Sequence, residues 1–225
     1  SPRGIVHALC EEACVRGDKM RESWTESLER IKPKPCQGAI EWAASYPTLQ
    51  AAWDACERGD WMLWWLGKCL VVEVGSPDHK KLVSIASANA KLALLYAEDG
   101  PPQPEHPTSI SVVEAWLKGE ATLAEVGDAT RAAQGHSWNA YEAAFWPAIR
   151  ATWAAINAAT RPPWAAAEAV GAVWAAAEAA IKAAERVRID VGAFWAAAQK
   201  ECAAIVRQHY PVASTVEVSD DCKGR

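Results

Sequence analysis

The sequence predicts an all-α protein: a single multi-helix, bundle-like domain with Ala/Trp-rich helices in its C-terminal half. Three observations support this. Almost every segment between glycine and proline residues repeats its apolar side chains at helical spacing. Alanine, the best helix former, is abundant and is interspersed with 13 tryptophans. Runs of β-branched residues are confined to 71–74 and 215–218, which are too short and isolated to form a sheet.

The N-terminal residues are expected to form an arm outside the main domain. Helices are predicted at 3–16, closed by Gly17, and at about 18–31. Prolines within 32–36 then stop the second helix, because each proline disfavours the helical conformation of the residue before it. The expected organisation is a helical arm with its connector, a helical domain and a polar tail, at 1–38, 39–211 and 212–225.

Capping residues divide the first half of the domain into short helices. Gly59 is expected to end one helix and Asp60 to cap the next. Ser76 to Asp78 is a strong helix start, because it combines a serine cap, a proline at the first position and an aspartate near the positive helix end. After a short piece around 41–46, the helices expected in this half lie at 47–58, 61–72 and 77–97.

Prolines organise the second half of the domain. The proline-rich stretch 99–107 is expected to be an exposed loop without helix. Pro147 is expected to kink or break one helix, whereas Pro162 begins another. The helices expected in this half lie at 109–118, 122–134, 137–159, 162–187 and 190–209.

Five tryptophans of the second half form the first candidate site. They fall within a stripe about 80° wide on a helical wheel when the prolines between them are ignored. They are Trp138, Trp146, Trp153, Trp164 and Trp174. The simpler interpretation is that each segment turns its indoles into the core, where alanines let neighbouring backbones approach. The alternative is that the indole faces converge on a flat or cationic small molecule, such as a nucleotide.

A charged turn between two helices, beside several tryptophans, is the second candidate site. Its residues are Glu57, Arg58 and Asp60. In the simpler interpretation Asp60 caps a helix and Arg58 neutralises the end of the preceding one. In the functional interpretation a charged corner next to indoles binds a protein partner, since arginine and tryptophan are the commonest anchors of such interfaces.

The sequence offers little catalytic or metal-binding chemistry. His7, Cys10 and Cys14 fall within about 60° on one predicted helix face, but a fourth zinc ligand is missing, and reduced core residues are the simpler interpretation. No phosphate loop, zinc-protease motif or dinucleotide fingerprint appears. The five histidines accompany no evident nucleophile with an orienting carboxylate. We therefore expect neither an enzyme nor a bound cofactor.

Composition restricts the partners and the compartment. The net charge of −5 is modest and dispersed, so duplex nucleic acid is not an expected partner. No apolar stretch reaches the roughly 18 residues of a transmembrane helix, so no membrane association is expected. Seven cysteines at irregular spacing indicate a reduced protein of the cytoplasm, in which Cys56, Cys69 and Cys202 act as small core residues.

Four sequence blocks occur in a recognisable order. They are 49–66, 78–96, 113–123 and 202–207. In this order they resemble the Imm-5-like immunity proteins, which are alanine-rich helical proteins of bacteria and phages. The resemblance implies an all-α fold and a non-enzymatic role, in which the protein neutralises a toxin or another antagonist by binding it. It does not include the N-terminal arm, and the repetitive tract has tryptophan where those proteins usually carry tyrosine and alanine.

Three interpretations of the function follow. In the leading one, the protein binds and blocks a protein antagonist. In the second, the tryptophans line a pocket that sequesters a small molecule. In the third, the Ala/Trp helices pack against identical copies in a structural assembly, since exposed indole patches favour oligomers.

Overall fold

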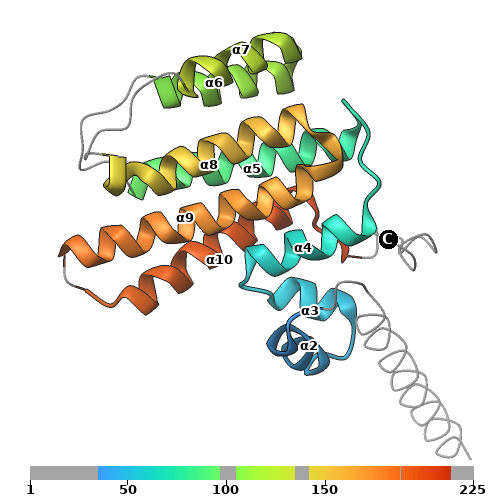
Figure 1. Cartoon of the computed structure of the whole chain (residues 1–225). Helices are drawn as coiled ribbons and strands as arrows, with labels where there is room; N and C mark the ends of the chain where they lie inside the picture. The colour runs from blue at the N-terminus through green and yellow to red at the C-terminus, as the bar shows by residue number, and fades with distance from the viewer. Residues whose placement is uncertain (1–34, 97–104, 135–141, 188, 214–225) are drawn as a thin grey trace, which may run out of the picture. The chain divides into compact units, whose positions relative to one another are not determined.

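A computed structural model of the chain describes residues 35–96, 105–134, 142–187 and 189–213 (Figure 1). All regular structure within these residues is helical, which confirms the predicted all-α class. The chain divides into two compact units, one formed by residues 1–56 and 212–225 and the other by 57–211. The helices predicted at 3–16 and 18–31, and most of the predicted tail, lie outside the described residues.

Two short helices form the described part of the first unit. They are α2 (Gln37–Ala44) and α3 (Leu49–Ala55). Thr48 caps α3, because its hydroxyl oxygen accepts a hydrogen bond from a backbone N–H of the first turn. The backbone N–H of Ala213 donates to the side-chain oxygen of Gln50 at 2.8 Å, so the end of the described chain is attached to α3.

The second unit contains the remaining helices, which pack in layers (Figure 1). In chain order they are α4 (Gly59–Cys69), α5 (Pro77–Tyr96), α6 (Glu105–Lys118), α7 (Leu123–Gln134), α8 (Glu142–Thr160), the 3₁₀ turn η1 (Pro162–Trp164), α9 (Ala165–Val187) and α10 (Val191–His209). The pair α6 and α7 packs against α5 and α8, whereas α9 packs against α4, α5, α8 and α10. Helix α9 is therefore the central element of the unit.

Side-chain caps explain why several helices begin where the sequence predicts. Ser76 accepts a hydrogen bond from the first turn of α5. Thr122 and Glu125 form a reciprocal capping box at α7, in which each side chain accepts from the backbone N–H of the other residue. Asp190 accepts from two backbone N–H groups at the start of α10. Each such cap stabilises a helix by about 1 kcal/mol.

Several predicted boundaries are wrong, mostly next to prolines. Helix α2 begins at Gln37, before the short piece expected around 41–46, with Cys36 as its N-cap residue after the last proline of the connector. Helix α6 begins at Glu105, inside the stretch expected to be a loop. At Pro147 the sequence allows a kink or a break, and the break does not occur, because α8 continues through this residue. Helix α4 ends at Cys69 and not at 72.

Alanine fills the space between α5, α8 and α9. The buried alanines of these helices are Ala86, Ala90, Ala93, Ala151, Ala154, Ala155, Ala158, Ala159, Ala165, Ala166, Ala169, Ala172, Ala175, Ala176, Ala177, Ala179, Ala180 and Ala184. Close helix contacts follow from the small side chains. A Cβ added to Gly67 of α4 would lie 3.0 Å from the Cβ of Ala166 in α9. The interior here combines many alanine methyl groups with a few larger aliphatic side chains, such as Ile85, Ile156 and Val173.

The segment Pro162–Glu185 is long and apolar enough, by length and composition, to cross a membrane, and it is the one such segment among the described residues. The expectation that no stretch reaches this length is therefore wrong. Its apolar character has another explanation, because 56% of its most apolar window is buried against neighbouring helices. A long alanine-rich helix at the centre of a bundle has the composition of a weak membrane span.

Candidate functional site

The second candidate site, the charged turn, lies where the N-terminus of α4 meets α10, and we name it the Arg58 corner. Its residues are Glu57, Arg58, Asp60, Trp61 and Trp195. Gly59 is the first residue of α4, and a Cβ at this position would lie 2.7 Å from the Cβ and 2.9 Å from the carbonyl carbon of Cys202. Contacts this short include backbone that cannot move aside. Glycine therefore permits the close approach of α4 to α10.

Asp60 is a buried ion-pair partner and not a helix cap. The structure places it in the first turn of α4, where Arg58 is the N-cap residue. Arg58 Nε and Nη2 donate to the two carboxylate oxygens of Asp60 at 2.9 and 2.7 Å. The side chain of Asp60 is only 5% exposed, whereas that of Arg58 is 28% exposed. This two-pronged pair supplies the hydrogen bonds that a buried carboxylate requires.

The guanidinium of Arg58 makes cation–π contacts with two indole rings. Its central carbon lies 4.5 Å from the ring centroid of Trp61 in α4 and 4.7 Å from that of Trp195 in α10. Both rings are half-buried. The sequence indicated Trp61 as a neighbour of the corner but gave no sign of Trp195, because only the packing of α10 on α4 brings that ring to Arg58. Cation–π contacts of this kind hold both rings in fixed orientations.

Glu57 completes the corner with an exposed ion pair. Its carboxylate lies 2.7 Å from the ammonium of Lys200 in α10, and both side chains are well exposed. An exposed pair of this kind contributes at most about 1 kcal/mol to stability. Each charged side chain of the Arg58 corner therefore has a partner of opposite charge.

The first candidate site, the tryptophan stripe, is only partly described. Trp138 lies outside the described residues, and Trp146 belongs to α8 without a described side chain. Trp153 of α8 is half-buried. Trp164 at the end of η1 is 65% exposed and Trp174 in α9 is 50% exposed. The expectation that these last two indoles face the core is wrong, because alanines occupy the buried side of α9.

The two exposed indoles belong to a surface strip that we name the outer face of α9. It consists of Trp164, Ala167, Gly171 and Trp174. Arg161 and Glu178 flank it, and Glu178 accepts a hydrogen bond of 2.8 Å from Arg150 of α8. An enclosed cavity needs buried walls, so the pocket interpretation receives no support from Trp164 and Trp174.

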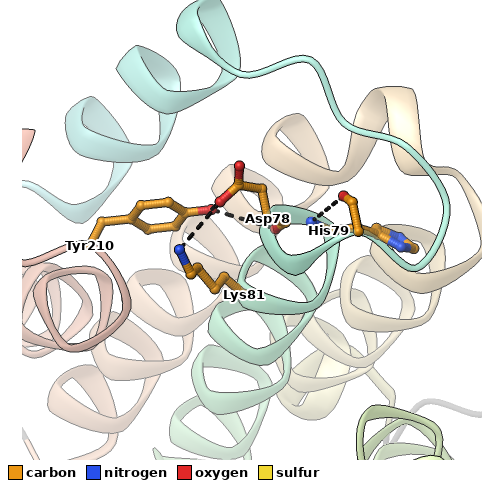
Figure 2. Close-up of polar contacts among 5 residues, drawn as sticks. Asp78, His79, Lys81 and Tyr210 are labelled. Atoms are coloured by element: carbon orange, nitrogen blue, oxygen red, sulfur yellow. Dashed lines mark hydrogen bonds and ion pairs between the residues drawn. The ribbon is translucent and has the colours of Figure 1, made fainter. Parts of the chain in front are cut away.

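A cluster that the sequence did not indicate joins α5 to the end of α10 (Figure 2). The hydroxyl of Tyr210 donates to the Asp78 carboxylate at 3.2 Å, and Lys81 lies beside both groups, 3.4 Å from the carboxylate and 4.8 Å from the ring centroid (Figure 2). Burial raises the pKa of Tyr210, and the Asp78 charge raises it further. The phenol is therefore protonated at neutral pH, which suits a structural hydrogen bond.

His79 follows Asp78 but points the other way, into the interior (Figure 2). Its Nδ1 accepts from the backbone N–H of Gly75 at 2.9 Å, so its Nε2 donates to the carbonyl of Ala158 in α8 at 2.8 Å. Its ring meets the edge of Trp116 at a centroid distance of 5.3 Å. Burial lowers the pKa of His79, against a smaller opposite effect of the Ala158 bond. The neutral ring thus connects three elements, which are α6, α8 and the turn that precedes α5.

Ser84 and His209 are in side-chain contact, with Oγ 3.3 Å from Nε2. Burial lowers the pKa of His209, and Lys81 lowers it further, so the ring is neutral. The distance exceeds the usual reach of about 2.6–3.2 Å for an activated nucleophile. Within the described part of the chain no carboxylate bonds to this histidine. The contact therefore fits a hydrogen bond between α5 and α10 better than a catalytic pair.

The described residues offer little support for a metal site or for a reactive thiol. His7, Cys10 and Cys14 lie outside them, and no other group of metal-ligating side chains is found in the part that the structure describes. The three cysteines predicted to be core residues are buried, which confirms that placement: Cys56, Cys69 and Cys202. Burial raises the pKa of Cys202 to about 12, so its thiol does not ionise near neutral pH.

No family model, no curated protein and no solved structure matches the chain. The resemblance to the Imm-5-like immunity proteins therefore stays a prediction that rests on the order of the sequence blocks.

Proposed function

We propose that the protein is a non-enzymatic helical binding protein of the immunity type, which neutralises a toxin or another protein antagonist by docking through the Arg58 corner. One observation carries the proposal. The guanidinium of Arg58 lies against two half-buried indoles, those of Trp61 and Trp195, and forms an ion pair with the buried carboxylate of Asp60. Arginine and tryptophan are the residues most enriched at the centres of protein interfaces.

Rigidity supports this assignment. A side chain that is already fixed loses little conformational entropy when a partner binds, and association otherwise costs about 0.5–1.5 kcal/mol for each immobilised side chain. The rings of Trp61 and Trp195 are oriented by their contacts with one cation, and Gly59 fixes the spacing of the helices that carry them. The corner therefore presents two large apolar surfaces at small additional cost.

Charge pairing indicates the chemistry of the partner. Arg58 is neutralised by Asp60, and Glu57 by Lys200. The net charge of −5 suits a basic antagonist, such as a nuclease, but it is modest. At the corner itself, apolar contact with the indole edges is the larger contribution. We expect a partner with an exposed apolar protrusion and an affinity that depends only weakly on salt.

The proposal is tested by capture and titration with the full chain. The tagged protein, Trp61→Ala and Leu95→Ala are each incubated with extracts of cells that encode the protein, at low and high salt, and bound proteins are identified by mass spectrometry. Leu95 is the control, because it is an exposed apolar side chain that lies on α5, away from the corner. We expect one protein bound by the parent and the control, with Trp61→Ala weakening the affinity for the purified partner about 30-fold.

Two results would contradict the proposal. One is the absence of any bound protein at every salt concentration. The other is a partner whose affinity is the same for the parent and for Trp61→Ala, because the corner would then not be the docking site. Circular dichroism of each variant shows whether the fold is retained, so that a loss of binding is not a loss of structure.

We also infer a reducing compartment, such as the cytoplasm. The support is the burial of Cys56, Cys69 and Cys202 as small core side chains, which suits thiols that remain reduced. A thiol titration of the denatured protein, purified without reductant from its own cells, gives seven thiols if this inference is correct. Fewer thiols would indicate disulfides and a different compartment.

A further inference from the structure

The outer face of α9 has a symmetric arrangement of large and small residues. Along the helix the order is Trp164, Ala167, Gly171 and Trp174, so two indoles flank two small residues about a centre near position 169. The members on α9 lie within about 60° on a helical wheel. Trp164 is 65% exposed and Trp174 is 50% exposed. A surface with this pattern matches itself when it is turned end over end.

The small residues at the centre are not required by contacts inside the chain. A Cβ added to Gly171 would meet only the Cβ of Ala154, at 3.8 Å, which is an ordinary contact. At Gly59 and Gly67 the corresponding distances are 2.7 and 3.0 Å, and the glycines there are explained by packing. A glycine inside a helix weakens it relative to alanine. Gly171 therefore leaves room at the surface that the fold itself does not use.

Charged residues flank the face at both ends. Arg161, whose charge acts on the nearby Glu168 carboxyl, is exposed before the first indole. Glu178, which pairs with Arg150 of its own chain, follows the second. When two copies of the helix lie antiparallel about position 169, residues at equal distance from the centre face each other. Arg161 of one copy then lies next to Glu178 of the other, and this occurs twice because the arrangement is two-fold. A parallel arrangement would instead bring like charges together.

We propose that two copies of this chain pair through the outer face of α9, antiparallel and two-fold. Ala167 and Gly171 lie at the crossing and let the two backbones approach, while Trp164 of each copy packs on Trp174 of the other. The face is isologous, as in most dimers, so the same residues serve on both sides. This pairing uses a different surface from the Arg58 corner and is independent of the proposed function.

Analytical ultracentrifugation of the purified full chain, at increasing concentration, tests the pairing. We expect a mass that rises from monomer to dimer. Gly171→Leu blocks the crossing, and Trp174→Ala removes two ring contacts per dimer, so each raises the dimer dissociation constant at least about tenfold. Leu95→Ala is the control, because Leu95 is an exposed apolar side chain of α5. It leaves the dissociation constant unchanged.

A monomer at the highest soluble concentration would overturn the proposal and leave the face to some other occupant. A dimer that Gly171→Leu and Trp174→Ala do not weaken would overturn it as well, because the copies would then pair elsewhere. The monomer fold of each variant is checked by thermal unfolding at low concentration. There we expect no large loss for Gly171→Leu, since a Cβ at this position makes only an ordinary contact, 3.8 Å from the Cβ of Ala154.

Discussion

The junction of α4 with α10 and the outer face of α9 use glycine and tryptophan in opposite ways. At the junction, Gly59 lets two backbones meet, and the indoles of Trp61 and Trp195 are fixed on one cation. On the outer face, Gly171 has space around it, and Trp174 is 50% exposed. The same residue types thus stabilise the fold in one region and remain available for contact in the other. Only the neighbouring helix distinguishes the two roles.

Removal of the guanidinium at the junction should have the largest effect. We expect Arg58→Ala to lower the free energy of unfolding by about 3 kcal/mol, because it leaves the buried carboxylate of Asp60 without its partner. Urea denaturation followed by circular dichroism measures the change. Replacement of both partners, as Arg58→Met with Asp60→Leu, should recover most of the loss, since no buried charge remains. Equal losses for the single and double variants would show that the ion pair is not what stabilises the junction.

The addition of a methyl group should have opposite effects on stability at Gly59 and Gly171. We expect Gly59→Ala to destabilise the protein by about 2 kcal/mol, because the new Cβ would lie 2.7 Å from the Cβ of Cys202, and also close to backbone. The measurement is the shift of the denaturation midpoint at constant slope. An unchanged midpoint would mean that α4 and α10 do not approach as closely as the structure places them.

Acid should lower the free energy of unfolding through the buried ring of His79. This ring is neutral, in contrast to the ion pair of the junction. Burial lowers the pKa of His79 below its unfolded value of about 6.5. The unfolded chain therefore takes up a proton first, and stability is fully present above about pH 6.5 and is lost as the pH falls through the folded pKa. His209 shifts in the same direction. Each contributes at most about 1.4 kcal/mol per pH unit.

His79→Gln tests this assignment by difference. The free energies of unfolding of the parent and the variant are compared between pH 7 and pH 5, where the variant should fall less steeply. Both chains keep His209 and all carboxylates, so the difference in slope isolates His79. Identical slopes would contradict a neutral, buried ring.

The smallest effect is expected at Gly171. Alanine at this position should stabilise the monomer by about 0.5–1 kcal/mol, because its methyl group fits at 3.8 Å from Ala154 and favours the helix. Thermal unfolding at low concentration measures it. A loss similar to that of Gly59→Ala would remove the contrast between the two glycines.

Local signals made the helices predictable. The side chains of Ser76 and Asp190 accept hydrogen bonds from backbone donors within one turn. The residues at the start of α5 and α10 are therefore enough to predict where these helices begin. Prolines were misleading in the stretch 99–107, where α6 begins at Glu105 although a loop without helix is expected. Asp60 was misread for a similar reason, since a carboxylate in the first turn of a helix resembles a cap until its partner is known.

The direction of the indoles could not be predicted. A helical wheel shows which residues share a face but not which face is buried, and the many alanines of α9 allow the core to form without its tryptophans. The contacts that define the sites are likewise distant in sequence. Trp195 reaches Arg58, and His209 reaches Ser84, only after α10 has packed. No spacing rule within one segment connects such pairs.

The most direct test of the contrast between buried and exposed indoles is ¹⁹F NMR of the protein labelled with fluorotryptophan. Signals are assigned with single Trp→Phe variants at 65, 164 and 174, and recorded in H₂O and D₂O at a concentration where the chain is monomeric. The structure predicts clear solvent isotope shifts for Trp164 and Trp174, and almost none for Trp65, which is 6% exposed. Equal, small shifts at all three positions would place the α9 indoles in the core and contradict the account.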